Sequence, residues 1–541
     1  MGLPNFHFKG ECAHIEPSVP CSERDLKEER RLKEKQAAVQ MRNITKRFGS
    51  VVANDKCWLD IYHGEILALL GENGSGKTTM MNMLSGIYYP DEGQISINGK
   101  PVSIRSPKDA FGYGIGMIHQ HFKLVDVLTA AENITLGLEE KLDLRSVSKK
   151  VREICDKYGF EVDPEQKIYD MSVSQKQTVE IVKVLYRGAD ILILDEPTAV
   201  LTPQETDKLF AVLRNMRDDG KAIVIITHKM HEVEDLSDRV AILRHGQFVG
   251  DMLTKDTNAQ EMTNMMVGHP VTLNIDRPDP VNPKPRIEVK NLTVRSMDGI
   301  VKLDDVSFTA NSGEILGIAG ISGCGQKELL EAIAGLQPTE KGSICYITDE
   351  GKKEELLGKD PLEIAEMGVA LSFVPEDRLG MGLVGNMDLS DNMMLRSFRR
   401  GKGVFTDRRT PKKLAETVVQ ELEVNTPGVS TPVRRLSGGN VQKVLVGREI
   451  SSAPTVLLTA YAVRGLDINS SYTIYDLINR QKAQGVAVIY VGEDLDVLLE
   501  LSDRILVLCG GKVSGIVPGR GATKRDVGMM MTRLGGNKAD E

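Results

Sequence analysis

Short uninterrupted runs of aliphatic residues recur along the chain, and each predicts a buried strand. Residues 66–70 read ILALL, residues 191–194 read ILIL and residues 222–226 read AIVII. Runs of this length are typical of parallel strands covered on both faces. Residues 39–45 instead alternate apolar and polar side chains, as a strand with one exposed face does, and residues 78–84 predict a helix. These patterns predict an α/β fold.

The second half of the chain repeats the first. Residues 287–293 (IEVKNLT) parallel residues 39–45 (VQMRNIT), and residues 501–505 (LSDRI) parallel residues 236–240 (LSDRV). A repeat of about 250 residues is far longer than the period of a solenoid and indicates two copies of one domain.

The repeat and the composition of the segments around it predict four parts of the chain. Residues 1–36 form a charged N-terminal extension, which is either a solvated tail or a docking segment. Residues 37–269 form the first domain and residues 286–541 the second. Residues 270–285 between them form a stiff, proline-rich linker that restricts the separation of the domains. Its prolines are Pro270, Pro278, Pro280, Pro283 and Pro285.

Composition narrows the classes of protein. The 541 residues are 41% hydrophobic and 27% charged, as in ordinary globular domains. No apolar run reaches the length of a membrane span and no secretory leader opens the chain, so any membrane-spanning part must belong to another protein. A net charge of −8 argues against sequence-independent binding of nucleic acid. The seven cysteines are scattered, which suits reduced thiols in the cytosol.

Residues 71–79 read GENGSGKTT and match the phosphate-binding loop G-x-x-x-x-G-K-[ST]. Glycines let successive backbone N–H groups surround phosphate oxygens. Lys77 would supply positive charge to the β- and γ-phosphates, and the Thr78 hydroxyl a ligand for Mg²⁺. The predicted helix places its N-terminus at the phosphates. The expected nucleotide-binding residues of the loop are Gly71, Glu72, Asn73, Gly74, Ser75, Gly76, Lys77, Thr78 and Thr79.

Two carboxylates, Asp195 and Glu196, follow the strand predicted at residues 191–194. Ligands lie beyond the carboxyl ends of strands in a parallel sheet, so these acids should face the phosphates. One carboxylate can hold Mg²⁺ and the other can take a proton from an attacking water. His228 follows the next strand and is notable only for that position. Phe48, ahead of the loop, either stacks on an adenine ring or serves as a hydrophobic anchor.

The phosphate loop, the strand that ends in two carboxylates and the histidine follow one another along the chain as they do in the nucleotide-binding domain of ABC transporters, which this chain resembles. The resemblance includes Gln120, residues 172–175 (SVSQ) and residues 436–442 (LSGGNVQ), which are close to the ABC signature. It implies two tandem P-loop ABC-type ATPase domains. Each would have a RecA-like core sheet, an antiparallel β subdomain and a helical subdomain.

Residues 117–122 (MIHQHF), 374–378 (VPEDR) and 464–467 (RGLD) resemble the ribose and nucleoside class of importers, and within it the nucleoside-uptake branch. This resemblance implies two transmembrane permease subunits and, through them, an extracytoplasmic substrate-binding protein. It also implies a peripheral position on the cytoplasmic face of the cell membrane and no nucleic-acid partner. The segment between Gln120 and Met171 would receive the permease.

The resemblance further implies that the two domains close head to tail, with ATP between the phosphate loop of one domain and the signature of the other. Glu196, His228, Gln120 and Lys77 would be catalytic, and Thr78, Gln120 and Asp195 would arrange Mg²⁺. Phe48, Ser437, Gly438, Gly439 and Asp467 would complete the ATP site.

The second half departs from this pattern at every position that carries charge chemistry. The replacements, each aligned with its first-half counterpart, are Gln326 (Lys77), Lys327 (Thr78), Ala460 (Asp195), Tyr461 (Glu196), Glu493 (His228) and Glu376 (Gln120). The first-half signature, which would face these residues, has Ser174 in place of a glycine, and Thr202 stands where the family has Asp. All departures fall on one composite site, which predicts one working ATPase site and one degenerate site.

Two other classes compete with this interpretation. A soluble tandem ABC ATPase acting on ribosomes or nucleic acid would keep both sites intact and carry a long charged linker. A nucleotide sensor without hydrolytic activity would not need the complete set of Lys77, Asp195, Glu196 and His228.

Overall fold

The computed structural model describes residues 37–532, except for 50, 120–121, 139–142, 199–200, 228, 271–273, 297–298, 322, 374–381, 396, 399–405, 451–453, 465, 467 and 493. Gln120, His228, Asp467, Glu376 and Glu493 therefore lie outside the described residues, as does the N-terminal extension at residues 1–36.

Each half contains a four-stranded antiparallel sheet and a six-stranded sheet that is parallel except for one edge strand. In the first half the small sheet has the order β2-β1-β4-β5 and the large sheet the order β10-β9-β3-β8-β7-β6. Their bounds are β1 (Ala37–Phe48), β2 (Val51–Tyr62), β4 (Glu92–Ile97), β5 (Lys100–Val102), β3 (Glu65–Leu70), β6 (Ile115–Ile118), β7 (Ile191–Asp195), β8 (Ala222–Ile226), β9 (Arg239–Arg244) and β10 (Gln247–Leu253).

The second half repeats this topology, with orders β12-β11-β14-β15 and β16-β17-β18-β13-β19-β20. The bounds are β11 (Pro285–Arg295), β12 (Val301–Asn311), β14 (Lys341–Ile347), β15 (Lys353–Glu355), β16 (Val369–Phe373), β17 (Val456–Ala460), β18 (Ala487–Val491), β13 (Ile315–Ala319), β19 (Arg504–Cys509) and β20 (Lys512–Pro518). The predicted duplication and the α/β class are confirmed.

Helices flank both sheets. In the first half they are α2 (Lys77–Leu84), α3 (Pro107–Gly112), α4 (Ala130–Thr135), α5 (Leu144–Tyr158), α6 (Val173–Tyr186), α7 (Pro203–Asp218), α8 (Met230–Leu236) and α9 (Ala259–Val267). In the second half they are α10 (Gln326–Ile333), α11 (Pro361–Glu366), α12 (Leu389–Met394), α13 (Arg409–Glu421), α14 (Gly438–Ile450), α15 (Ile468–Ala483), α16 (Leu495–Leu501) and α17 (Lys524–Thr532). Within the described ranges, none of the helices has the length and apolarity needed to cross a membrane.

The aliphatic runs form the strands that were expected of them. Every residue of β3 and of β8 is buried, and the two strands pair in parallel from Glu65 and Ala222 onward. Side chains on both faces of these strands belong to separate apolar clusters, so the sheet is covered on each side. This burial explains the lack of polar alternation in the runs.

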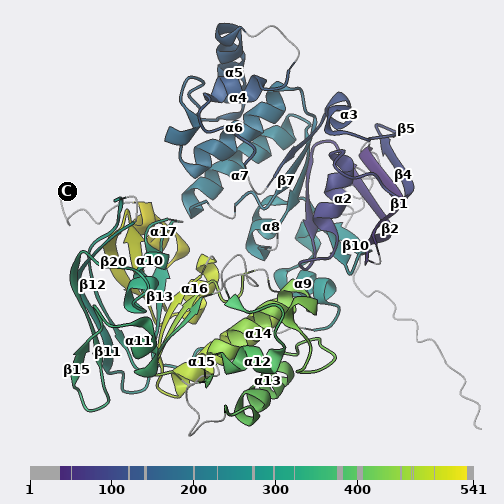
Figure 1. Ribbon diagram of the computed structural model, residues 1–541. Helices are drawn as coiled ribbons and strands as arrows, with labels where there is room; N and C mark the ends of the chain where they lie inside the picture. The colour runs from purple at the N-terminus through teal and green to yellow at the C-terminus, as the bar shows by residue number, and fades with distance from the viewer. Residues whose placement is uncertain are drawn as a thin grey trace, which may run out of the picture.

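The two halves lie in opposite orientations (Figure 1). In the upper half the small antiparallel sheet is on the right and helices α4–α6 are on the left, whereas in the lower half the small sheet is on the left and α12–α14 are on the right. Each half also contacts the other through the start of one of its helices, α15 in the second half and α7 in the first. Ile468, at the start of α15, packs on the apolar cluster of the first half. Pro203, at the start of α7, lies against Gly528 of α17.

Candidate functional site: an intact and an altered phosphate loop

The phosphate loop of the first half connects β3 to α2, as the sequence predicted. Gly76 has a φ of 97° and precedes the helix. A Cβ atom at this position would lie 2.3 Å from the carbonyl oxygen of Ala53, so only glycine fits. The loop is thereby held close to β2 by a contact that no larger residue permits.

Lys77 points back over this loop. Its Nζ atom donates to the carbonyl oxygens of Gly71 at 2.7 Å and Glu72 at 3.0 Å. Helix α2 has no side-chain cap at its N-terminus. Among the described residues, the buried Ser75 hydroxyl oxygen has no hydrogen-bond partner. Uncapped N–H groups, a curled lysine and an unpaired hydroxyl together fit a polyphosphate.

Asp195 ends β7 and lies beside the loop. Its Oδ2 atom is 3.5 Å from the Thr78 hydroxyl, which donates to it. Glu196 follows with a φ of 47°, in the left-handed region that a glutamate rarely adopts. The Glu196 N–H donates to the carbonyl of Ile226 at 2.8 Å, which fixes this strained turn. Strain of this kind is concentrated at functional sites.

The shifted pKa values of Asp195 and Lys77 indicate that the site has too little positive charge. Burial, reinforced by the neighbouring Glu196 carboxylate, raises the pKa of Asp195 to about 6. Burial also lowers the pKa of Lys77, although Glu196 and Asp195 oppose that change. The lysine therefore does not compensate the two carboxylates fully. A divalent cation beside Thr78 and Asp195 would supply the missing positive charge.

Phe48 ends β1 and is 43% exposed. Its ring meets Tyr88 edge to face, with centroids 5.1 Å apart, and the Lys46 ammonium lies 5.6 Å from its centroid. A ring held on one edge and open to solvent is suited to stacking on a base.

The second-half loop has the same backbone and different chemistry. Gly325 also has a φ of 97°, and the Gln326 amide donates to the Gly320 carbonyl at 2.7 Å, as Lys77 does to Gly71. Tyr461, the counterpart of Glu196, has a φ of 55° and donates its N–H to Val491 at 2.9 Å. Ala460, the counterpart of Asp195, is fully buried at the end of β17. The fold of the site is retained and its charges are not.

The intact loop lies against the other half of the chain. The Asn73 side-chain amide donates to the carbonyl oxygen of Leu466 at 3.3 Å. Leu466 immediately precedes Asp467, which, like Gln120 and His228, lies outside the described residues. This contact joins two residues 393 positions apart in the sequence, next to the Asp467 position that the resemblance assigned to the same ATP site.

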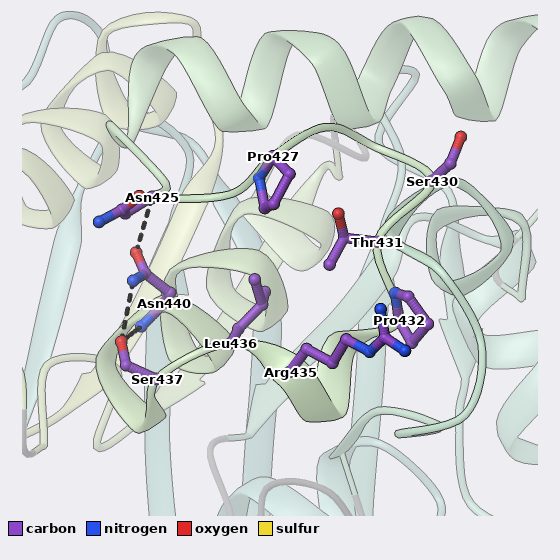
Figure 2. Close-up of a pocket in the computed structure, with 9 residues that line it drawn as sticks. All are labelled: Asn425, Pro427, Ser430, Thr431, Pro432, Arg435, Leu436, Ser437 and Asn440. Atoms are coloured by element: carbon purple, nitrogen blue, oxygen red, sulfur yellow. Dashed lines mark hydrogen bonds between the residues drawn. The ribbon is translucent and has the colours of Figure 1, made fainter. Parts of the chain in front are cut away.

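Ser437 and Gly438 are exposed where α14 begins, and Gly439 lies in the first turn of this helix. Beside them lies a cavity of about 460 Å³ (Figure 2). The cavity is lined by Asn425, Pro427, Ser430, Thr431, Pro432, Arg435, Leu436, Ser437 and Asn440. Asn440 and Asn425 were given no role from the sequence, although Asn440 stands inside the signature.

Comparison with known proteins identifies the family. The model for ABC transporters matches residues 55–199 and 303–459, once in each half. The nucleoside import ATP-binding protein NupA of Lactococcus lactis subsp. cremoris is 40% identical, over 93% of this chain and 99% of the relative. The guanosine import ATP-binding protein NupO of Bacillus subtilis is 40% identical over 91% and 97%, and the ribose import ATP-binding protein RbsA 1 of Rubrobacter xylanophilus is 38% identical over 90% and 97%.

Among solved structures, a chain of the complex between archaeal ribosomal stalk protein aP1 and archaeal ribosome recycling factor aABCE1 has a TM-score of 0.58 and 16% identity. It covers 88% of this chain and 90% of its own, a likeness of fold alone. With two matched domains, and with relatives whose length is covered almost completely, this chain belongs to the ABC transporter family.

Proposed function

We propose that this chain is the ATP-hydrolysing subunit of an ABC importer for a small hydrophilic solute, either a nucleoside or a simple sugar. The names of its relatives, which specify import of nucleosides, guanosine and ribose, support this substrate class. Hydrolysis takes place at one composite site, which the first-half phosphate loop and the second-half signature form together.

One observation carries the assignment of a single working site. Lys77, Thr78 and Asp195 converge at the first loop with Glu196 beside them, whereas the second loop has the same backbone with Gln326, Ala460 and Tyr461. Loss of the lysine, the metal carboxylate and the base removes the means of neutralising charge and of activating water.

The chain's own residues divide the work of hydrolysis. Lys77 and the N–H groups of the loop hold the phosphates, and Phe48 stacks on the adenine. Glu196 orients the attacking water and accepts its proton, while His228 steadies the γ-phosphate. Ser437, Gly438, Gly439 and Asp467 close the site from the second half. Phosphoryl transfer depends on positioning and on charge neutralisation more than on covalent chemistry.

Mg²⁺ fits the donor set of Thr78, Asp195 and Gln120. Mg²⁺ keeps several waters and takes phosphate oxygens as ligands, so it needs only one or two protein carboxylates or hydroxyls, such as Asp195 and Thr78. When bound, Mg²⁺ neutralises charge that develops on the phosphates.

The proposed partners are two transmembrane permease subunits and, through them, an extracytoplasmic substrate-binding protein. The proposed location of this chain is peripheral, at the cytoplasmic face of the membrane. The helical region between Gln120 and Met171, which contains α4 and α5, is the proposed docking surface for a permease.

Reconstitution with the two permeases in vesicles tests the proposal. ATP-dependent uptake of labelled nucleosides or pentoses is expected with the wild-type chain. The matched control is Glu196→Gln, which should support no uptake. Hydrolysis that is neither stimulated by permeases nor coupled to uptake of either solute class would contradict an importer and favour a soluble tandem ATPase.

A further inference from the structure

The Asn440 side chain ties the signature serine to a loop of the helical region (Figure 2). Its Nδ2 atom donates to the Ser437 hydroxyl oxygen at 2.8 Å, and its own backbone N–H approaches the same oxygen at 3.4 Å. On the other side, the Asn425 backbone N–H donates to Oδ1 of Asn440 at 3.0 Å. Asn425 lies in the loop between α13 and α14.

The direction of this chain of hydrogen bonds is fixed. A backbone N–H can only donate, so the atom of Asn440 that faces Asn425 must be the carbonyl oxygen. The amide nitrogen then faces Ser437. A hydroxyl group has one hydrogen and two acceptor sites, so an oxygen that accepts from Asn440 has its hydrogen left to donate elsewhere. Ser437 is exposed and lines the cavity.

We infer that Asn440 is a positioning residue for ATP hydrolysis. Its amide orients the Ser437 hydroxyl as a hydrogen-bond donor toward the γ-phosphate held by the first-half loop. This inference rests on the proposed composite site. It goes beyond that site by assigning the orientation of Ser437 to two residues, Asn440 and Asn425, that need not touch the nucleotide for this effect.

The first-half signature shows that this arrangement is specific to the second half. Gln175 occupies the position of Asn440, but its side-chain oxygen accepts from the backbone N–H of Ser172 at 2.8 Å and caps the helix. The Ser172 hydroxyl accepts from the Gln175 backbone at 3.2 Å and lies 3.0 Å from the Ser174 hydroxyl. One additional methylene group thus diverts the amide from the serine hydroxyl to the backbone.

The substitution Asn440→Asp separates orientation from structure. A carboxylate keeps the acceptor for Asn425 but presents a second acceptor to Ser437, which turns the hydroxyl hydrogen away from the phosphate. An acid in the first turn of a helix is otherwise favourable. A purely structural role for Asn440 therefore predicts unchanged or improved stability and activity in Asn440→Asp, whereas the orienting role predicts a loss of activity in a stable protein.

The experiment measures kcat and KM for ATP, together with the melting temperature, in full-length Asn440→Ala, Asn440→Asp, Ser437→Ala and Ser437→Ala/Asn440→Ala. Gln175→Ala is the matched control at the same position of the other signature. We expect Asn440→Ala to lower kcat by about three- to tenfold, with a smaller change in KM. Asn440→Asp should lower kcat further at an unchanged melting temperature, and Gln175→Ala should hydrolyse ATP as the wild type does.

The double variant decides whether Asn440 acts through Ser437. If it does, adding Asn440→Ala to Ser437→Ala causes no further loss of kcat. Independent, multiplying losses would overturn the inference and assign Asn440 a contact of its own, which a changed preference for ATP over 2′-deoxy-ATP would reveal. Wild-type activity in Ser437→Ala would instead contradict the composite site itself, so the two failures are distinguishable.

Discussion

The two phosphate loops of this chain share a backbone and differ in charge. Both have a glycine with a φ of 97° before the helix, and in both the next side chain donates to the first carbonyl of the loop at 2.7 Å. The strained residue that follows β7 in the first half and β17 in the second is present in both, as Glu196 and as Tyr461. Only the first site has a lysine at the first position of the helix, where the second half has Gln326, and two carboxylates where the second half has Ala460 and Tyr461.

This difference separates the requirements for the geometry of the loop from the requirements for catalysis, which cannot be told apart in a single intact site. Loop geometry depends on glycines, on packing and on hydrogen bonds to backbone, all of which an amide such as Gln326 can satisfy. In the proposed mechanism, phosphoryl transfer depends on charge at Lys77, Asp195 and Glu196. Under the proposed composite site, a half that keeps the geometry without the charges can still present Ser437 to the first-half loop, which would explain why the second half retains the fold.

The largest expected effect is that of Glu196→Gln. Glutamine has the same shape but cannot accept the proton of the attacking water. Steady-state hydrolysis should fall by at least about 100-fold, while ATP still binds. Phosphate release and equilibrium binding of ATP measure the two properties, and normal turnover in this variant would remove Glu196 from the mechanism.

Lys77→Gln transfers the second-half residue into the first loop. Gln326 shows that an amide fits this backbone, so the protein should fold normally. Loss of charge-assisted hydrogen bonds worth about 1.5–3 kcal/mol should weaken ATP binding by about 10- to 150-fold. Calorimetric titration with ATP and Mg²⁺ measures the effect.

The matched control for this variant is Gln326→Lys. It restores the charge of the second loop without its carboxylates and should add no hydrolysis. Undiminished affinity in Lys77→Gln would show that the lysine does not distinguish the loops.

Asp195→Asn should stabilise the nucleotide-free protein while abolishing hydrolysis. Because folding raises the pKa of Asp195 to about 6, the ionised carboxylate destabilises the folded state at pH 7.5. Removing that charge should contribute about 1 kcal/mol after screening by solvent, or about 2–4 °C in the melting of the first half.

The sign of this effect sets its pH dependence. The penalty develops as the pH rises from the ordinary pKa of 3.8 to about 6, so the difference between Asp195→Asn and wild type should shrink on acidification from pH 7.5 to pH 5. A lower melting temperature for the variant at pH 7.5 would show that Lys77 compensates the charge.

Tyr461→Phe should have the smallest effect. Tyr461 stands where the first half has its proposed base, Glu196, but the second site lacks the counterparts of Lys77 and of the proposed metal ligand Asp195. Hydrolysis should remain within experimental error of wild type, as measured by phosphate release. A collapse of activity in a well-folded Tyr461→Phe variant would mean that the second site takes part in the chemistry.

Much of this account could be predicted from local sequence. Aliphatic runs such as residues 222–226 are buried on both faces, so their composition alone indicates β8. The phosphate loop and the pair Asp195 and Glu196 were identifiable because their spacing is fixed by the strand and helix beside them.

Individual contacts between distant segments were not predictable from local sequence. The family resemblance implied that the first-half phosphate loop shares its site with Asp467, but nothing in either local sequence specifies that Asn73 meets Leu466. Asn425 contacts Asn440 because the loop after α13 folds back toward the start of α14. Tyr88, which follows the phosphate loop in the sequence, packs against Phe48, which precedes it. Tertiary packing, which leaves no periodic signal, determines all three contacts.

The central claim is that one of the two sites turns over ATP. Orthovanadate traps ADP at a site that has just hydrolysed ATP, so the trapped ADP per chain counts working sites. The account predicts saturation at one ADP per wild-type chain and none in Glu196→Gln. Two trapped ADP per chain, or one that persists in Glu196→Gln, would contradict it.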